Sequence, residues 1–493
     1  MISMDAVKAI YGVIEAFFLV YLVCYTVFLV ASVTVGAVSL YELRRRKETY
    51  NFLQHEYSVP ISIIIPAHNE QLTVADTVRS LLELKYRLYE IIVVDDGSTD
   101  DTVKLLIEQL GLVKTARPIH KKISCSGETG VYMSCEHRVP VTLITKENGG
   151  KADALNLGVS AAEYPYVVCM DADSVLQYDA LETIAKSVME SDDVIAVGGL
   201  VRIINDVTIE NGRVLDYRLP KSLLLCMQVL EYDRSFLASR MLFDKFNGNL
   251  IVSGAFGLFR KDILIAVGGY NNATLGEDME LILRFHAFAR ENNIKYRIRY
   301  SADAVCWSQA PGTLKDLKKQ RKRWHIGLYE SMRDHREILF DPGSGLLGLL
   351  SFTYYLFYEL LSPYIELFGL VSMITASAFG LINVPYMLTL MGMYVLFNSI
   401  MSFTSFLSRI NAMDIRLRAR DYFKAAAVSL VENIGLRFLL MFTRLTALFG
   451  YRRHGATWGS IVRSRYRTLG DTEKAAAALG DDEDIGGKEE HEA

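Results

Sequence analysis

The chain of 493 residues lacks the features that mark several common protein classes. Its six cysteines form no Cys-x-x-Cys pair and have no matching histidine spacing, which argues against structural zinc and predicts free thiols in a reducing compartment. The net charge is only -4, and the acidic stretch from residue 470 onward carries more than that, so no basic excess points to nucleic acid. A GxxxxGK[ST] loop is missing, which argues against a P-loop ATPase.

Long apolar runs are present, and they help to raise the hydrophobic share to 51%. The first runs from about residue 10 to 40 and ends at the basic cluster 44–47. It has no basic segment before it and no clear cleavage site, so a transmembrane helix is favoured over a signal peptide or a buried core helix. The basic cluster predicts that the region after it lies in the cytoplasm.

Further apolar segments follow in the last third of the chain. Residues 346–407 are long enough for two spans, broken near 383–385, with Glu359 and Glu366 on one face. Acidic groups at bilayer depth are expected to face protein, water or bound product, unless this part lies at the interface. Arginines flank residues 425–450 on both sides, which favours an interfacial helix or re-entrant hairpin over a single span.

Between these apolar parts the pattern is that of an α/β domain. Short β-branched runs at 61–65 (ended by Pro66), 91–94, 141–144 and 166–170 are separated by helical periodicity, which predicts a mostly parallel sheet. Ligands collect at the carboxyl ends of such strands, where several polar motifs lie. The polar connection from 114 to 138 is expected to be a surface excursion, with a role in binding a donor or partner as the alternative.

Polar residues after the first two strands can form a pocket for a base and a ribose, namely Pro66, Asn69, Glu70, Asp95 and Asp96. The alternative is turn and capping chemistry, which Asp-Gly-Ser also favours. After a later strand, Asp171 and Asp173 can converge on Mg²⁺ or Mn²⁺ that also binds phosphate oxygens. Lys151 follows two glycines at a helix start, where it can reach a phosphate.

Two helical motifs complete the set. Glu277 and Asp278 begin a helix, where a carboxylate can act as a general base or simply cap the helix. On a later basic helix, Gln320 and Arg323 share a face suited to a diphosphate, and Trp324 offers a ring for stacking. The alternative is a basic, aromatic helix that lies on the membrane surface.

With these motifs in order, residues 61–324 resemble a family 2 inverting glycosyltransferase of the GT-A fold. The pattern is similar to that of the membrane synthases of cellulose, chitin, hyaluronan and poly-N-acetylglucosamine. The resemblance implies Asp278 as the general base, Asp173 as the metal ligand, and an Mg²⁺ or Mn²⁺ cofactor. It implies donor binding by Pro66, Asn69, Glu70, Asp95, Asp96, Lys151, Asp171, Gln320 and Arg323. It implies acceptor binding by Gly254, Ala255, Glu277 and Trp324.

The sequence departs from these relatives in places. Gly276 stands where cellulose-type enzymes have threonine, no PilZ-like domain follows, and three expected spans are few for a channel. The resemblance implies an α/β GT-A catalytic domain with α-helical transmembrane and interfacial segments. The expected regions are a transmembrane helix with its basic flank at 1–47, a cytoplasmic catalytic domain at 48–340, membrane helices at 341–467, and a disordered acidic tail at 468–493.

The expected activity is transfer from a UDP-sugar to a growing β-linked exopolysaccharide at the cytoplasmic face of the cell membrane. One alternative is the addition of a single sugar to a lipid acceptor, and another is a sensor or scaffold with a dead site. The expected partners are the donor, a glycan or lipid acceptor, membrane lipids, and a second copy or an export protein, with no nucleic acid. The motifs do not name the sugar or the linkage.

Overall fold

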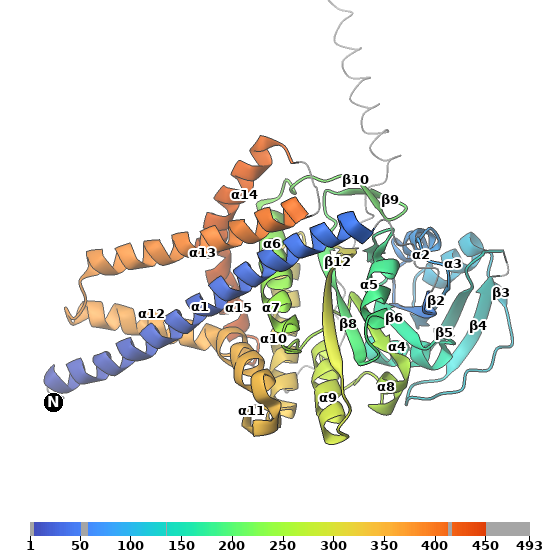
Figure 1. Cartoon of the computed structure of the whole chain (residues 1–493), viewed down its shortest axis with the longest axis horizontal. Helices are drawn as coiled ribbons and strands as arrows, with labels where there is room; N and C mark the ends of the chain where they lie inside the picture. Colours follow the sequence, from blue (N-terminus) through green and yellow to red (C-terminus); the bar gives the residue numbers. More distant parts are fainter. Residues whose placement is uncertain (1–3, 51–57, 135, 413–416, 450–493) are drawn as a thin grey trace, which may run out of the picture.

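The structure is a computed structural model that describes residues 4–50, 58–134, 136–412 and 417–449. A sheet-centred body lies at one side of the molecule, and long helices extend from it on the other (Figure 1). The extended helices include α1 (Met4–Tyr50), α12 (Ser362–Ala378) and α13 (Val384–Ala412). Helix α1 packs along α13.

In the described residues, ten strands form one sheet in the order β3-β4-β5-β2-β1-β6-β11-β8-β12-β7. They are β1 (Ile61–Ala67), β2 (Tyr89–Asp96), β3 (Val113–Lys114), β4 (Glu128–Ser134), β5 (Val141–Lys146), β6 (Tyr166–Met170), β7 (Val175–Leu176), β8 (Val194–Ile203), β11 (Phe256–Arg260) and β12 (Arg297–Ser308). A separate hairpin pairs β9 (Thr208–Glu210) with β10 (Arg213–Asp216).

The predicted parallel strands form the centre of this sheet. The neighbours β5, β2, β1 and β6 run parallel, and so do β8 and β12. Antiparallel pairs occur on both sides of the centre, so the whole sheet is mixed. Parallel central strands bring their carboxyl ends to one edge, which is where the predicted motifs begin.

Strand β1 continues beyond the predicted end at Pro66. Every residue of the strand is buried, as expected for a β-branched run covered on both faces. Its pairing with β6 ends at Ile64, while pairing with β2 continues to Ala67. Pro66 therefore lies where the strand has a neighbour on one side only, a position in which proline is tolerated.

Helices cover both faces of the sheet. One apolar core lies under α2 (Val74–Leu82), α3 (Thr102–Leu110) and α5 (Ala180–Met189). The opposite core lies under α4 (Lys151–Ala161), α8 (Lys261–Ala266) and α9 (Glu277–Glu291). This three-layer arrangement confirms the predicted α/β class.

Two further cores join the sheet to the helical half. One contains residues of β8, β12 and α6 (Leu223–Asp233) together with α13, α14 (Ala419–Val431) and α15 (Arg437–Leu445). The other packs α9 against α10 (Leu314–Asp334), α11 (Glu337–Phe340) and the π-helices η3 (Leu347–Phe352) and η4 (Tyr355–Leu360). The remaining segments are η1 (Arg234–Ser239), α7 (Arg240–Asp244), η2 (Pro342–Ser344) and η5 (Glu432–Leu436).

Three helices in the described part are long and apolar enough to cross a membrane: Met4–Arg45, Val384–Asn411 and Ala419–Leu445. A bent pair, Leu347–Leu360 with Ser362–Ala378, passes the same test across a 54° bend. The break predicted near 383–385 is present, because α12 ends at Ala378 and α13 begins at Val384. The interfacial or re-entrant course of 425–450 stays a prediction, and the predicted acidic tail lies outside the described residues.

The apolar helices that could cross a membrane, α1 and those between residues 347 and 445, are called the membrane half below, and acidic residues in them pair with arginines. Glu366 lies 2.7 Å from the Arg437 guanidinium, and Glu359 lies 3.7 Å from that of Arg444. The two acids are seven residues apart and so are the two arginines, so antiparallel helices make two matched contacts. Both acids thus face protein, one of the surroundings predicted for them.

The predicted free thiols are present at the five cysteines that the structure describes, Cys24, Cys125, Cys169, Cys226 and Cys306. Cys135 lies outside the described residues. The connection between β3 and β4 is mostly exposed, as expected, although Ile123 is buried in the core beside α4. The expectation that all of 114–138 is a surface excursion is wrong, because Glu128–Ser134 pairs with β5 as strand β4 of the main sheet.

Candidate active site

The Gly149-Gly150 turn is tied to the end of β2. Asp96 Oδ1 accepts a hydrogen bond from Gly149 N (2.9 Å), and Oδ2 accepts one from Gly150 N (2.8 Å). Gly150 has φ +93°, a conformation that glycine adopts without strain. Lys146, buried at the end of β5, also binds Asp96 and lies 2.8 Å from Asp153. Asp96 therefore fixes this turn, and both of its oxygens are occupied within the chain.

Asp95 has a different environment from its neighbour. Its Oδ2 accepts a 3.3 Å hydrogen bond from Ser98 N, while its buried Oδ1 has no hydrogen-bond partner among the described residues. Burial raises the pKa of the Asp95 carboxyl above its usual range. An inward carboxylate oxygen that lacks a donor is suited to an N–H or O–H group of a ligand. Of the two predicted aspartates, Asp95 is therefore the better candidate for direct contact.

The other residues of the predicted base-and-ribose pocket lie at the same edge. Pro66 is at the end of β1, and Asn69 has φ 56° in the loop after it. Asn69 Oδ1 accepts a 2.8 Å hydrogen bond from Thr99 N, which joins the loops after β1 and β2. Glu70 is buried, and its Oε2 accepts a 3.0 Å bond from Thr73 Oγ1. These contacts hold the loops after β1 and β2 together at this edge.

Lys151 brings three other motifs together. Its Nζ lies 2.7 Å from Asp171 Oδ1, just after β6, and 3.4 Å from Glu277 Oε1 at the start of α9. Gly254 N donates a 3.3 Å hydrogen bond to Asp278 Oδ2. A Cβ on Gly254 would lie 3.1 Å from Lys151 Nζ, so this glycine permits the close approach. Residues far apart in sequence thus meet at one point.

Electrostatics in this cluster differ between the lysine and the aspartate. Burial opposes the charge of Lys151, but the carboxylates of Asp171 and Glu277 outweigh it and raise the lysine pKa. Burial also raises the pKa of Asp278, the charge of Glu277 raises it further, and Lys151 opposes both. A carboxylate with a raised pKa is a stronger base than an exposed one, as general-base chemistry requires.

The predicted metal ligands Asp171 and Asp173 follow directly after β6, and the buried Oδ1 atom of Asp173 accepts no hydrogen bond among the described residues. Asp173 is 2% exposed, while Asp171 is more open and bound to Lys151. Among the described residues, no three His, Cys, Asp or Glu side chains are grouped to hold a metal ion. A cation here would therefore rest on one or two carboxylates, and phosphate oxygens of a bound substrate would complete its coordination. Mg²⁺ and Mn²⁺ accept such a ligand set.

Helix α10 presents the predicted Gln-x-x-Arg-Trp residues. Gln320 is buried, Arg323 is half-buried, and Trp324 is 41% exposed. The guanidinium of Arg321 lies 4.5 Å from the Trp324 ring centroid, and its Nη2 donates a 2.7 Å bond to Glu231 of α6. Arg321 thus holds the tryptophan in place while leaving much of its ring open.

Sequence reasoning missed Lys146 and Arg321 as parts of the site. The signal for Lys146 was a lysine at the end of an otherwise buried strand, which needs acidic partners. The signal for Arg321 was its place beside the motif residues in the basic run of α10. The partners Asp96, Asp153 and Glu231 lie 7 to 90 residues away, so the sequence alone did not identify them.

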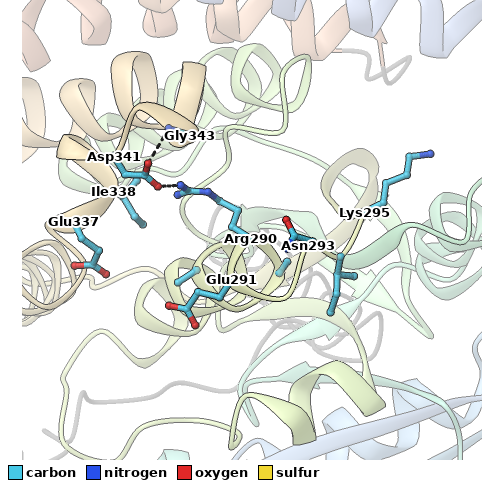
Figure 2. A pocket seen from close by; sticks show the side chains of 11 residues that line it. Arg290, Glu291, Asn293, Lys295, Glu337, Ile338, Asp341 and Gly343 are labelled. Carbon is cyan, nitrogen blue, oxygen red and sulfur yellow. Dashed lines mark hydrogen bonds and ion pairs between the residues drawn. The ribbon is translucent and has the colours of Figure 1, made fainter.

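A separate hollow of about 640 Å³ lies at the far end of α9 (Figure 2). Its lining includes Arg290, Lys295, Glu337 and Asp341, and Arg290 pairs with Asp341. Arg290 Nη1 also donates a 2.7 Å bond to Ser344 Oγ. None of the predicted site residues is among its described lining. The contacts of Arg290 with Asp341 and Ser344 join α9 to the segment that leads to the apolar helices.

Comparison with known proteins finds similar families and relatives. Models of two families match the chain: "Glycosyl transferase family group 2" over residues 166–408 and "Glycosyl transferase family 2" over residues 62–122. The poly-beta-1,6-N-acetyl-D-glucosamine synthases of Staphylococcus aureus (strain COL) and Staphylococcus epidermidis (strain RP62A) are each 29% identical over 314 residues. These matches cover 63% of this chain and 65% of each relative, so the chain spans just under two thirds of the relatives' length.

A solved structure with a similar course is the mannosyltransferase PcManGT from Pyrobaculum calidifontis in complex with GDP-Man and Mn²⁺. It is 16% identical, has a TM-score of 0.46, and the similarity covers 84% of this chain and 99% of that one.

The mixed sheet, the strand-end carboxylates and the family matches define a glycosyltransferase with a GT-A catalytic domain. The chain belongs to glycosyltransferase family 2.

Proposed function

We propose that the enzyme transfers a sugar from a UDP-sugar to the end of a growing β-linked exopolysaccharide, with inversion at the anomeric carbon. The observation that carries this proposal is the meeting of Lys151, Asp171, Glu277 and Asp278 at one point beside Gly254. Such a cluster unites the groups needed for a diphosphate with the group needed for an acceptor hydroxyl. A dead sensor or scaffold would not need to keep every one of them.

The donor is proposed to lie along the carboxyl edge of the parallel strands. Asp95 Oδ1 is free to accept a hydrogen bond from the uracil or ribose, next to the wall formed by Pro66, Asn69 and Glu70. Asp96 is proposed to act indirectly, since it holds the Gly149–Gly150 turn.

At the diphosphate, Lys151, Gln320 and Arg323 are proposed to bind the oxygens. Asp171 and Asp173 would hold a divalent cation there. When bound, that cation neutralises charge on the departing diphosphate. Lys151 would then exchange part of its contact with Asp171 for the phosphate.

Asp278 is proposed to accept the proton of the acceptor hydroxyl. The hydroxyl oxygen forms a bond to the anomeric carbon from the face opposite UDP, and the bond to the diphosphate oxygen breaks with its electron pair. Gly254, Ala255 and Glu277 are proposed to lie along the acceptor, and the exposed ring of Trp324 to stack on its terminal sugar. Positioning and fixed charges supply much of the rate.

The second candidate is transfer of one sugar to a lipid acceptor, with the same chemistry. The apolar helices beside the site make a lipid acceptor accessible. Polymer synthesis is favoured because the matched relatives are named as synthases of a poly-N-acetylglucosamine. Their name also makes N-acetylglucosamine the first sugar to test. We place the catalytic domain at the cytoplasmic face of the cell membrane, where a nucleotide sugar is available. The proposal also includes an export protein or a second copy of this chain as a partner.

The test uses purified protein in lipid nanodiscs with Mn²⁺ and a panel of radiolabelled UDP-sugars. A high-molecular-weight product from one donor, with UDP-N-acetylglucosamine tested first, is the expected result. A lipid-extractable product that carries one sugar would select the second candidate. Tight UDP binding without turnover on any donor and acceptor would contradict both and favour a sensor or scaffold.

A further inference from the structure

The start of α9 touches the middle of α10 through two glycines. A Cβ on Gly276 would lie 2.8 Å from Gly327 Cα, and a Cβ on Gly327 would lie 2.6 Å from Gly276 Cα. Carbon atoms do not approach so closely, so this backbone contact requires glycine on both helices. The contact joins the helix that begins with the proposed base Asp278 to the helix that carries Trp324.

Glu330 reinforces this contact from α10. Its Oε2 accepts hydrogen bonds from Thr274 Oγ1 (2.8 Å) and from Leu275 N (2.8 Å). Thr274 Oγ1 in turn accepts a 3.1 Å bond from Gly276 N. Glu330 is only 6% exposed, so these bonds are shielded from water. Residues 274–276, directly before α9, are therefore held by a carboxylate on α10.

The bonds of Asp278 itself do not fix this arrangement. Its Oδ1 accepts from Met279 N (2.9 Å) within α9, and its Oδ2 accepts from Gly254 N (3.3 Å) near β11. They orient the carboxylate toward its own helix and the sheet, whereas Gln320, Arg323 and Trp324, which belong to the proposed diphosphate and acceptor site, lie on α10. A shift of the order of 1 Å between reacting groups can cost roughly 100-fold in rate.

We propose that Glu330 is a positioning residue that sets the distance between the base Asp278 and the substrate-binding side chains of α10. It acts through Thr274 and Leu275 and does not touch the substrate. This inference rests on the proposed function and deepens it.

The test compares Glu330→Ala, Glu330→Gln and the control Ser331→Ala in nanodiscs. Glu330→Ala removes both hydrogen bonds, so we expect kcat to fall about 10- to 100-fold, while KM for the donor and Kd for UDP change less than about threefold. The amide oxygen of glutamine can still accept both bonds, so Glu330→Gln is expected to keep at least about a third of kcat. Ser331 is buried next to Glu330 on α10, and its variant should keep kcat within about twofold.

Thr274→Val provides a second variant that leaves Glu330 in place. It removes one of the two donors, and we expect kcat to fall about three- to tenfold. In the Glu330→Ala background the same change should reduce kcat by a smaller factor than in wild type, because only the bond from Gly276 N to Thr274 Oγ1 is then left to lose. If Glu330→Ala does not fold, the comparison of Thr274→Val with wild type decides the question.

Several outcomes would overturn the inference. Wild-type kcat in Glu330→Ala, or in Thr274→Val, would contradict it while leaving the proposed function intact. A fall in Glu330→Ala that is matched by weaker UDP binding, or is not rescued by glutamine, would indicate a merely structural role. A wild-type protein that binds UDP but transfers no sugar would contradict the proposed function, and with it the role of Glu330.

Discussion

The catalytic edge and the membrane half both contain buried or half-buried carboxylates, but these are neutralised in different ways. Around Lys151, the carboxylates of Asp171 and Glu277 share one ammonium group, and Asp278 lies beside them. In the membrane half each of three acids has an arginine of its own, as listed here: Glu359 with Arg444, Glu366 with Arg437, and Glu432 with Arg234.

This difference distinguishes ion pairs that stabilise the fold from carboxylates that are not fully neutralised until a ligand binds. A buried ion pair is complete in itself, and removing one partner destabilises the fold. An excess of carboxylates is costly until a cation, a proton or a donor group arrives. The comparison therefore predicts that substitutions at the edge change catalysis and metal use, while substitutions in the membrane half change stability.

Of the three changes that compare the two regions, the one with the largest expected effect concerns metal use. Asp173→Asn should raise the Mn²⁺ concentration for half-maximal activity at least about tenfold and lower activity at fixed Mn²⁺ about 100-fold, since one anionic ligand is lost. Glu277→Gln, in the same cluster but not proposed as a ligand, should change the Mn²⁺ requirement less than about threefold. Equal Mn²⁺ curves for wild type and Asp173→Asn would remove Asp173 from the metal site.

The next effect is on stability in the membrane half. Glu366→Gln should lower the free energy of unfolding by about 1–3 kcal/mol, because Arg437 loses its charged partner. The double variant Glu366→Gln with Arg437→Met should cost less than the sum of the single changes. Thermal unfolding of the purified protein measures both, and strictly additive losses would show that the pair is not coupled.

The smallest expected effect is a shift in pH dependence. Asp278 must be ionised to accept a proton, and its pKa is raised by burial and by the charge of Glu277. As the pH is lowered, activity should therefore begin to fall at a higher pH than it would if the base were an ordinary aspartate. Glu277→Gln removes one of these causes and should move the acidic limb of kcat/KM to lower pH, by ~0.5–1 unit. A shift to higher pH, or none, would contradict the assigned electrostatics.

Much of the catalytic edge was predictable because its strands are buried on both faces. Runs such as 61–65 and 166–170 consist mostly of apolar and β-branched residues, which predicts buried strands. The polar residues that follow each run must then lie at the strand ends. The central parallel strands and the starts of α4 and α9 were predicted on this basis.

Contacts between distant segments were not predictable in the same way. The contact of Gly276 with Gly327 and the partners of Glu359 and Glu366 depend on how helices pack, which no local pattern encodes. The two aspartates after β2 looked equivalent in sequence, yet Asp96 is bound by the Gly149–Gly150 turn while Asp95 keeps an open oxygen. The antiparallel insertion of β11 between β6 and β8 likewise follows from long-range packing.

The most direct test of the account compares wild type with Asp278→Asn in the same nanodiscs, with UDP binding and sugar incorporation measured in parallel. The account predicts that the variant binds UDP with a Kd within about threefold of wild type and incorporates at least about 1,000-fold less sugar, because only the proton acceptor is lost. Incorporation by Asp278→Asn at a rate near that of wild type would contradict the assignment of the base and the reading of the acidic cluster as a reaction centre.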